Sequence, residues 1–477
     1  MNRFCQPLLC LCLAFLPLGA SAEDKADCAN DLDCKSSWLG LSKPERKQVF
    51  EYGDAYKAFM DAARTELSFV STATILVEDQ GFKRLTDRSP MQPGHKYYAV
   101  NRDRTIALIV VGREAPSKGF KVVGAHIDSP RLELKARPLY DKEGFALFQT
   151  TIHGGIKTYQ WTNVPLALSG RVDKKDGTTV RIDIGMNEAD PIFVVADMSP
   201  HTDRGFGDKP VKEQVKHEEL DPIMGHIPDA SGKEIAKQVL ALLKAEYGIS
   251  RADFVSAELA LTPAYKSRDL GFDRGLVAAY GQDDRLGAYA ALRAALALGT
   301  PERTAVVYLV DNEEVGNINN TGARSEYFSN LLARLLYAEL GDDYSDLARR
   351  RALTASEMVS IDVNPGINPK NPTAFEETNA PRLGFGVNLK MYGQGFNANS
   401  EFTARIRAML DENNIPWQTV TYKVGPRGGG TMGGEFSRLN MEVIDLGVPV
   451  LSIHTPLSIS SKVDGWNLYR ACAAFLD

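Results

Sequence analysis

Hydrophobic residues along the chain follow two spacings, and the change from one to the other marks the predicted elements. Residues 43–81 carry helical spacing, with Pro44 near the start. Two short, uninterrupted apolar runs follow, IALIVVG at 106–112 and FKVVGAH at 120–126. Runs of this kind, rich in β-branched residues, are typical of strands that are buried on both faces of a mainly parallel sheet.

The middle of the chain has a different pattern. Residues 131–272 hold shorter alternating stretches, such as TTVRIDIG at 178–185, and a polar loop around 203–219. Alternation of this kind predicts half-buried strands and a smaller β-rich unit. After Gly275 the strand–helix alternation resumes and continues to the C-terminus. We therefore predict one α/β domain, formed by residues 23–130 and 273–477, with an inserted β-rich domain at 131–272.

The first residues have the pattern of a targeting segment. Arg3 is followed by an almost wholly apolar run at 7–19, and Ala20, Ser21 and Ala22 form the small-residue pattern of a cleavage site. A membrane anchor is the alternative, but the run is shorter than the roughly 20 residues that a spanning helix needs. We predict that residues 1–22 are a cleavable signal peptide and that the protein is periplasmic or secreted.

Composition narrows the possible partners. The 477 residues are 44% hydrophobic and 24% charged, with a formal net charge of −6. Such a chain can bury a large core, and without a basic block it gives no reason to expect nucleic acid or an anionic membrane as a partner. An exported protein could join Cys28 and Cys34 in a small disulfide, with two free thiols as the alternative. Cys472 lies in an apolar C-terminal stretch and is expected to be buried.

Five apolar runs end in acidic or imidazole side chains. In open α/β sheets, sites form at the carboxyl ends of the strands, and five such coincidences are hard to obtain from surface polarity alone. The residues that follow the five runs are, in order, His126 with Asp128, Asp283 with Asp284, Asp311 with Glu313 and Glu314, Asp362, and His454.

These residue types point to a metal site without cysteine ligands. Imidazole and carboxylate ligands suit zinc, cobalt or manganese. Two ions would need more donors than two histidines supply, so a carboxylate should bridge them at a separation of roughly 3.5–4 Å. A carboxylate that binds no metal must take a proton from the attacking water, and the adjacent pair Glu313 and Glu314 can divide these tasks. Helix caps, salt bridges and core histidines are the alternative roles for these residues.

Six segments closely resemble the M18 family of metalloaminopeptidases, which includes aspartyl aminopeptidase. They occur in the family's order from about residue 41 to the C-terminus. The segments are VGAHIDSPRLELKARPLY, GQDDRLGAYAAL, DNEEVG, SIDVNP, GGGTMGG and SIHTP. The resemblance implies an α/β fold of the zinc-peptidase type with three layers, a central mixed sheet, and an inserted β-rich domain that serves as lid and assembly surface.

The resemblance also implies roles for individual residues. The metal ligands would be His126, Asp283, Glu314, Asp362 and His454, with Asp283 rather than Asp284 as the bridging carboxylate. Glu313 would be the general base, and Asp128 would orient His126. His201 resembles a histidine that reaches a neighbouring subunit's active site, with an ordinary surface role as the alternative.

Four further residues are candidates for substrate binding. Lys390 would face the substrate side chain, or else be an ordinary strand or surface lysine. Gly429, Gly430 and Thr431 would allow the peptide backbone to approach closely, or else form a flexible turn. His95, His153, His217 and His226 lack ligand-like neighbours in the sequence and are interpreted as structural or exposed.

The implied function is zinc-dependent removal of the N-terminal residue from short peptides, in a homo-oligomer that the resemblance makes a tetrahedral dodecamer with two metal ions per subunit. The sequence departs from the family at two places, which leaves open which N-terminal side chain the enzyme prefers in its substrate. Asn364 and Pro365 replace an alanine–histidine pair, and a tyrosine expected around Phe396 is missing. The alternatives are a carboxypeptidase or deacylase on the same scaffold, and a peptide-binding assembly without catalysis.

Overall fold

The computed structural model describes residues 35–203, 208–376, 378–393, 396–423 and 431–477. The predicted signal peptide, Cys28 and Cys34, and Gly428 to Gly430 lie outside these residues. Within them, no helix combines the length and the apolar character that crossing a membrane requires.

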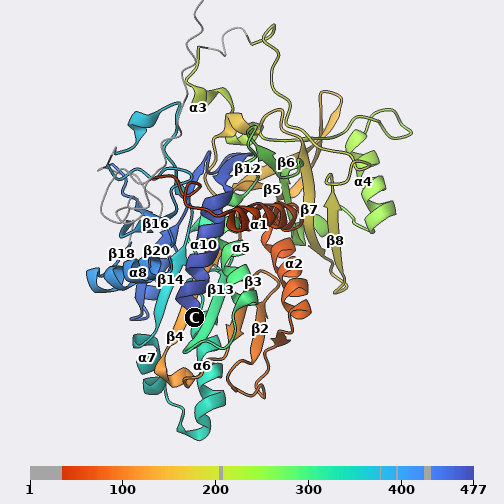
Figure 1. Cartoon of the computed structure of the whole chain (residues 1–477). Coiled ribbons are helices and arrows are strands. Elements are labelled where there is room, and N and C mark those ends of the chain that lie inside the picture. The colour runs from red at the N-terminus through yellow and green to blue at the C-terminus, as the bar shows by residue number, and fades with distance from the viewer. Residues whose placement is uncertain (1–34, 204–207, 377, 394–395, 424–430) are drawn as a thin grey trace, which may run out of the picture.

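A mixed sheet of nine strands forms the centre of the α/β domain (Figure 1). Its central strand β4 pairs in parallel with β13 on one side and β14 on the other, and β14 pairs in parallel with β20. The parallel strands therefore end at one shared edge. In spatial order the strands are β1 (Lys83–Arg84), β2 (Lys96–Asn101), β3 (Thr105–Val110), β13 (Thr304–Val310), β4 (Phe120–His126), β14 (Glu357–Ile361), β20 (Glu442–Gly447), β16 (Val387–Lys390) and β19 (Trp417–Thr419).

Helices cover both faces of this sheet, which gives three layers. Each face has its own hydrophobic core, because the central strands alternate their buried side chains between the two faces. On one face lie α1 (Lys43–Ala62), α2 (Glu66–Asp79), α5 (Gln282–Ala297), α8 (Ser400–Glu412) and α10 (Lys462–Leu476). On the other lie α6 (Tyr327–Leu340), α7 (Asp346–Thr354) and α9 (Gly433–Ser437).

The helical stretch predicted over residues 43–81 forms two helices. Ser42 caps α1 in a capping box with Glu45, and Pro44 occupies the first turn. The chain leaves the helix at Ala63, and Thr65 caps α2 through the backbone N–H of Ser68. A new cap therefore divides the helical pattern.

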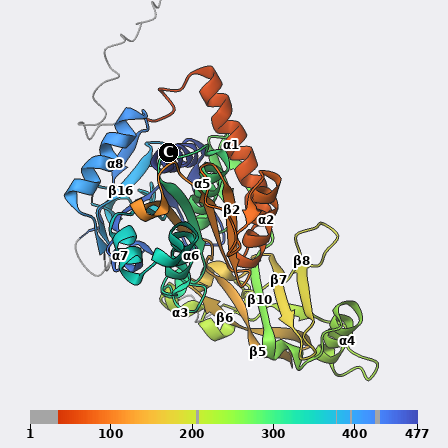
Figure 2. The ribbon, with the colours of Figure 1, turned by 90° about the horizontal axis from the view of Figure 1, so that it is seen from below.

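A second, antiparallel sheet lies at one end of the molecule (Figure 2). It has its own core and is accompanied by α4 (Ile235–Tyr247). Its strands all fall within residues 131–263. In spatial order they are β8 (Thr179–Ile184), β7 (Leu166–Asp173), β10 (Ala257–Pro263), β5 (Arg131–Lys142), β6 (Phe145–His153) and β9 (Ile223–Gly225).

The remaining elements are short. A five-stranded sheet runs through β11 (Arg268–Leu270), β12 (Leu276–Ala279), β22 (Ser458–Ser461), β21 (Pro449–Leu451) and β15 (Asn364–Pro365). Strands β17 (Tyr392–Gly393) and β18 (Phe396–Asn397) pair with each other, and α3 spans Val211–Gln214. Only the short segment 127–130 separates β4 from β5, so the six-stranded sheet begins beside the edge where the central strands end.

Candidate active site

The five predicted ligand residues come together from two sheets. His126 ends β4, Glu314 lies in a short 3-10 helix after β13, and Asp362 follows β14, so these three come from the edge of the nine-stranded sheet. Asp283 lies in the first turn of α5, shortly after β12, and His454 lies between β21 and β22; these three strands belong to the five-stranded sheet. The expectation that one sheet edge supplies all five residues is therefore wrong for Asp283 and His454.

Asp283 lies between the two histidines. Its Oδ1 is 3.2 Å from Nε2 of His126, and its Oδ2 is 3.1 Å from Nε2 of His454. Glu314 Oε1 is 3.3 Å from His454 Nε2, and Asp362 Oδ1 is 3.9 Å from His126 Nε2. Each histidine therefore has Asp283 on one side and a second carboxylate on the other.

The hydrogen bonds of the two rings decide which nitrogen faces this cluster. Nδ1 of His126 lies 3.1 Å from the carbonyl oxygen of Asp128 and 3.2 Å from its Oδ1. Nδ1 of His454 lies 2.7 Å from the carbonyl oxygen of Gly155. Because all three partners are acceptors, both Nδ1 atoms carry a hydrogen, and both Nε2 atoms face the carboxylates, where each would offer a lone pair to a metal ion that displaces its proton.

The donor set fits divalent metal ions. Ligand atoms of His126, Asp283 and Glu314 lie within 4.8 Å of one another, and so do those of His126, Asp284 and Asp362. Glu314 Oε1 is buried and makes no hydrogen bond of ordinary geometry to a described residue. A buried carboxylate oxygen that accepts no hydrogen bond is costly, and a cation would compensate it.

Asp284 lies with the carboxylates of the cluster, without the ordinary hydrogen bonds of a helix cap among the described residues. It is 0% exposed, and both of its carboxylate oxygens lack a hydrogen bond of ordinary geometry within the described residues. Burial raises the pKa of Asp284 well above its usual range, and the neighbouring Asp283 adds to the shift. Asp284 therefore belongs to the cluster, although the sequence does not distinguish it from a cap.

Three members of the cluster, one histidine and two glutamates, have raised pKa values. Burial opposes the charge of His126, but hydrogen bonds to Asp128 and Asp283 hold its pKa well above the usual range. Burial raises the pKa of Glu313 to about 7 and that of Glu314 to about 8, with Asp283 contributing to both shifts. Several carboxylates within a few ångströms repel one another, which is the arrangement that a bound cation relieves.

Asp128 is fully buried and accepts four hydrogen bonds. His126 Nδ1 and the backbone N–H of Glu313 reach its Oδ1, at 3.2 and 3.1 Å. His153 Nε2 and the backbone N–H of Glu314 reach its Oδ2, at 2.8 and 3.2 Å. These bonds place Asp128 behind His126 and beneath the segment that carries both glutamates.

His153 is the residue that the sequence interpretation missed. The sequence interprets it as structural or exposed; the structure excludes the exposed role, because the side chain is buried against Asp128 behind the candidate ligand His126. The signal was present, since His153 also stands at the end of a strand, β6, directly before two glycines. The pattern of uninterrupted apolar runs does not include β6, because this strand alternates buried and exposed residues as half-buried strands of the inserted region do.

Of the candidate substrate residues, Lys390 and Thr431 both lie beside Asp445, whereas His201 lies in the six-stranded unit. Lys390 is 2% exposed in β16, with its Nζ 5.8 Å from the centre of the Tyr422 ring. The Thr431 hydroxyl donates to Asp445 Oδ1 at 2.7 Å. His201 lies in an exposed turn of the six-stranded unit, where its backbone N–H donates to the Ser199 hydroxyl at 3.2 Å.

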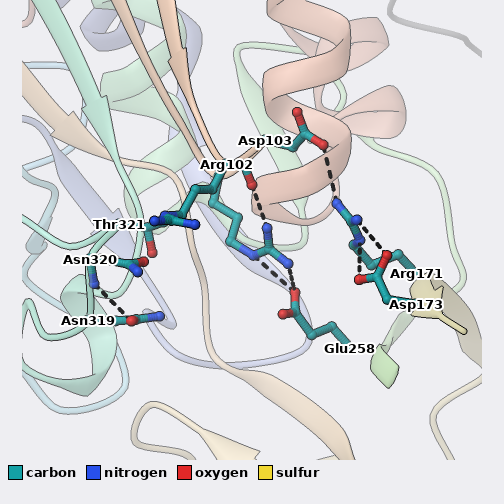
Figure 3. Close-up of a pocket in the computed structure, with 9 residues that line it drawn as sticks. Arg102, Asp103, Arg171, Asp173, Glu258, Asn319, Asn320 and Thr321 are labelled. Atoms are coloured by element: carbon teal, nitrogen blue, oxygen red, sulfur yellow. Dashed lines mark hydrogen bonds and ion pairs between the residues drawn. The ribbon is translucent and has the colours of Figure 1, made fainter. Parts of the chain in front are cut away.

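A polar cavity of about 510 Å³ lies where the α/β domain meets the six-stranded sheet (Figure 3). None of its lining residues belongs to the histidine–carboxylate cluster. Ion pairs cross it, with Arg104 pairing with Glu258, and Arg171 lying 3.2 Å from Asp103. We interpret this cavity as part of the interface between the two units and not as a substrate site. A second cavity of about 210 Å³ shares Arg104 and Glu258 with it and extends to His153.

A three-layer α/β fold with this cluster beside its strand ends has the architecture of a metallopeptidase. The sequence profile of the M18 family, described as aminopeptidase I zinc metalloproteases, matches residues 59–476. A probable M18 family aminopeptidase 1 from Clostridium acetobutylicum is 39% identical over 464 residues, which cover 94% of this chain and 99% of the relative. The chain therefore belongs to the M18 family of aminopeptidases.

Solved structures agree with this assignment. The crystal structure of the M18 aminopeptidase from Thermotoga maritima has a TM-score of 0.89 at 36% identity, covering 94% of this chain and 100% of that one. Aminopeptidase I from Clostridium acetobutylicum has a TM-score of 0.85 at 37% identity, covering 93% and 99%. Yeast mApe1, solved as a dodecamer, has a TM-score of 0.72 at 21% identity, a likeness that shows the fold alone.

Proposed function

We propose that the chain hydrolyses the N-terminal residue from short peptides, with two divalent metal ions, zinc being our first choice, and Glu313 as the general base. The observation that carries the proposal is the position of Asp283, whose two carboxylate oxygens each face the Nε2 of a different histidine. A bridging carboxylate between two nitrogen ligands is the arrangement that a pair of metal ions needs.

The residues divide into two sets of ligands around Asp283. His126 and Asp362 would hold one ion, and His454 and Glu314 the other, with Asp284 close enough to His126 and Asp362 to contribute. When bound, the ions supply Lewis acidity, which polarises a peptide carbonyl and lowers the pKa of a water.

Glu313 is suited to moving the proton. Its backbone N–H donates to Asp128 at 3.1 Å, and within the described residues no hydrogen bond or ion pair joins its carboxylate to either histidine Nε2. Burial raises the pKa of Glu313, and a carboxylate of raised basicity is suited to accept a proton from water and return it to a leaving amine. Glu314, one residue later, has its carboxylate on His454 instead.

The test is hydrolysis of a panel of aminoacyl-anilides with free or acetylated amines, after the protein has been stripped of metal and reloaded with zinc, cobalt or manganese. We expect activity to require metal and a free amine. Glu313→Gln should lower kcat by a factor on the order of 100 or more while metal content stays at two ions per chain. Glu326→Gln, on an exposed glutamate before α6, is the matched control.

Other outcomes would favour the alternatives. Turnover of acetylated substrates would indicate a deacylase, and a requirement for a free carboxylate would indicate a carboxypeptidase. Metal binding without turnover of any substrate would favour a peptide-binding role. The side-chain panel also reports whether acidic N-terminal residues are preferred, the role that family resemblance suggests for Lys390.

Assembly and location are part of the proposal. We propose a homo-oligomer, supported by the dodecameric form of yeast mApe1, with His201 reaching a neighbouring subunit and Gly429, Gly430 and Thr431 close to the substrate backbone. The proposed homo-oligomer is tested by measuring the molar mass of wild type and of His201→Ala by light scattering. We also propose export, and N-terminal sequencing of the mature protein would show whether the chain begins after Ala22.

A further inference from the structure

We infer that the β-rich unit orients both histidines of the metal site through one segment, residues 153–155 at the end of β6, and that His153 is the positioning residue in it. This inference rests on the proposed metal site. It adds that the affinity of the site for metal depends on a side chain outside the α/β domain.

The segment contacts three parts of the site. His153 Nε2 lies 2.8 Å from Asp128 Oδ2, and Asp128 Oδ1 in turn lies 3.2 Å from Nδ1 of His126. Two residues later, the carbonyl oxygen of Gly155 accepts from Nδ1 of His454 at 2.7 Å. The same segment therefore sets the ring orientation of His126 through Asp128 and that of His454 directly.

Glycine at position 154 allows the segment to lie close to the side chain of Glu314. Its backbone has φ +72°, and a Cβ added to it would lie 3.0 Å from Glu314 Oε2 and 3.2 Å from Glu314 Cβ. A side chain at this position would push against a proposed ligand, whereas glycine adopts the conformation and leaves the space open. Residues 153, 154 and 155 thus face Asp128, Glu314 and His454 in turn.

His153 is itself held from behind. Its Nδ1 lies 3.3 Å from Glu133 Oε1, and Glu133 also accepts from Arg131 Nη2 at 2.7 Å. Arg131 Nη1 continues the series to Glu66 Oε2 in α2, at 3.1 Å. Both ring nitrogens of His153 therefore face carboxylates, which fixes the ring in the plane that points Nε2 at Asp128.

Loss of the His153 side chain would change the hydrogen bonds that hold the Asp128 carboxylate. Asp128 is 0% exposed, and each of its oxygens receives one imidazole N–H and one backbone N–H. Without His153, Oδ2 would keep only the backbone N–H of Glu314, and the carboxylate could rotate away from His126. Hydrogen-bond partners behind a ligand of this kind typically change metal affinity by about 10-fold to 100-fold.

The experiment measures zinc affinity of the metal-free full chain by competition with a chromogenic chelator. His153→Leu removes the hydrogen bond to Asp128, and His153→Asn is too short to replace it, so we expect both to weaken the affinity by about 10-fold to 100-fold. His153→Gln can place an N–H near the position of Nε2 and should stay within a few-fold of wild type. His226→Leu, on an exposed histidine of the same unit, is the matched control.

The series separates orientation from stability. If His153 only stabilises the fold, the Asn and Gln variants lose the same imidazole charge and should behave alike, which would overturn the inference. Wild-type zinc affinity in His153→Asn would overturn it too, and the proposed function would stand. Failure of wild type to bind zinc at all would remove the proposed function together with it. The Asn variant covers the case in which His153→Leu does not fold.

Discussion

Asp464 links a buried carboxyl group to a measurable pH dependence of stability. It lies in the first turn of α10 and is 0% exposed, and its carboxylate accepts from the backbone N–H of Gly384 at 2.6 Å and of Gly386 at 2.9 Å. These bonds fix the chain just before β16. Burial raises the pKa of Asp464 from 3.8 to about 7, against the opposing effect of the two hydrogen bonds.

The sign and size of the effect follow from linkage. Because the folded state holds the proton more tightly, stability from this group is fully present below the unfolded pKa and is lost as pH rises through the folded pKa. The loss is about 1.4 kcal/mol per pH unit between the two values. For pKa values of 3.8 and about 7, the free energy of unfolding should fall by about 2.5 kcal/mol between pH 5 and pH 8 because of Asp464 alone.

The assay compares wild type with Asp464→Asn by urea unfolding in chelator at pH 5, 6, 7 and 8, because other titrations cancel in the difference. Asparagine can accept from one glycine N–H but turns its own amide donor toward the other, which should cost about 1–3 kcal/mol at pH 5. We expect the advantage of wild type to shrink by about 2.5 kcal/mol by pH 8. Asp79→Asn, on an exposed residue at the end of α2, is the control. A difference that stays constant over this range would refute the reasoning.

Three further predictions concern other buried positions. Thr431→Val removes the 2.7 Å hydrogen bond to the buried carboxyl group of Asp445 and should lower the free energy of unfolding by about 1–3 kcal/mol, with Thr431→Ser restoring it in the same urea assay. Gly447→Ala would place a Cβ 1.8 Å from the carbonyl oxygen of Asp362. We expect it to lower the free energy of unfolding by about 1–3 kcal/mol and to weaken zinc binding. Gly299→Ala, with open space around the added Cβ, should change neither quantity. Cys472 is 0% exposed and burial raises the pKa of its thiol, so a thiol reagent followed by peptide mass spectrometry should label it only after unfolding; labelling in the native protein would contradict this.

The sequence alone identified most of the candidate site, for a physical reason. Parallel strands that are buried on both faces have uninterrupted apolar sequences. The polar residues just beyond such strands lie together at the carboxyl edge of the sheet. Together with the family resemblance, which selects ligands among the polar residues after each strand, that argument finds His126, Glu314 and Asp362 without any knowledge of the strand order. It also finds Asp283 and His454, although these follow strands of the smaller sheet, because both sheets end beside the same cluster.

Tertiary structure decided what lies behind these residues. His153 belongs to an antiparallel strand of the β-rich unit, 25 residues from Asp128, and its place depends on how that unit docks onto the edge of the central sheet. Likewise, the buried position of Asp284 and the hydrogen bond between Thr431 and Asp445 follow from packing between distant segments. Periodicity records which face of an element is buried, but it carries no information about which other element covers that face. The sequence by itself therefore determined the elements and the candidate ligands at their ends, while only the packed chain determined the partners that orient them.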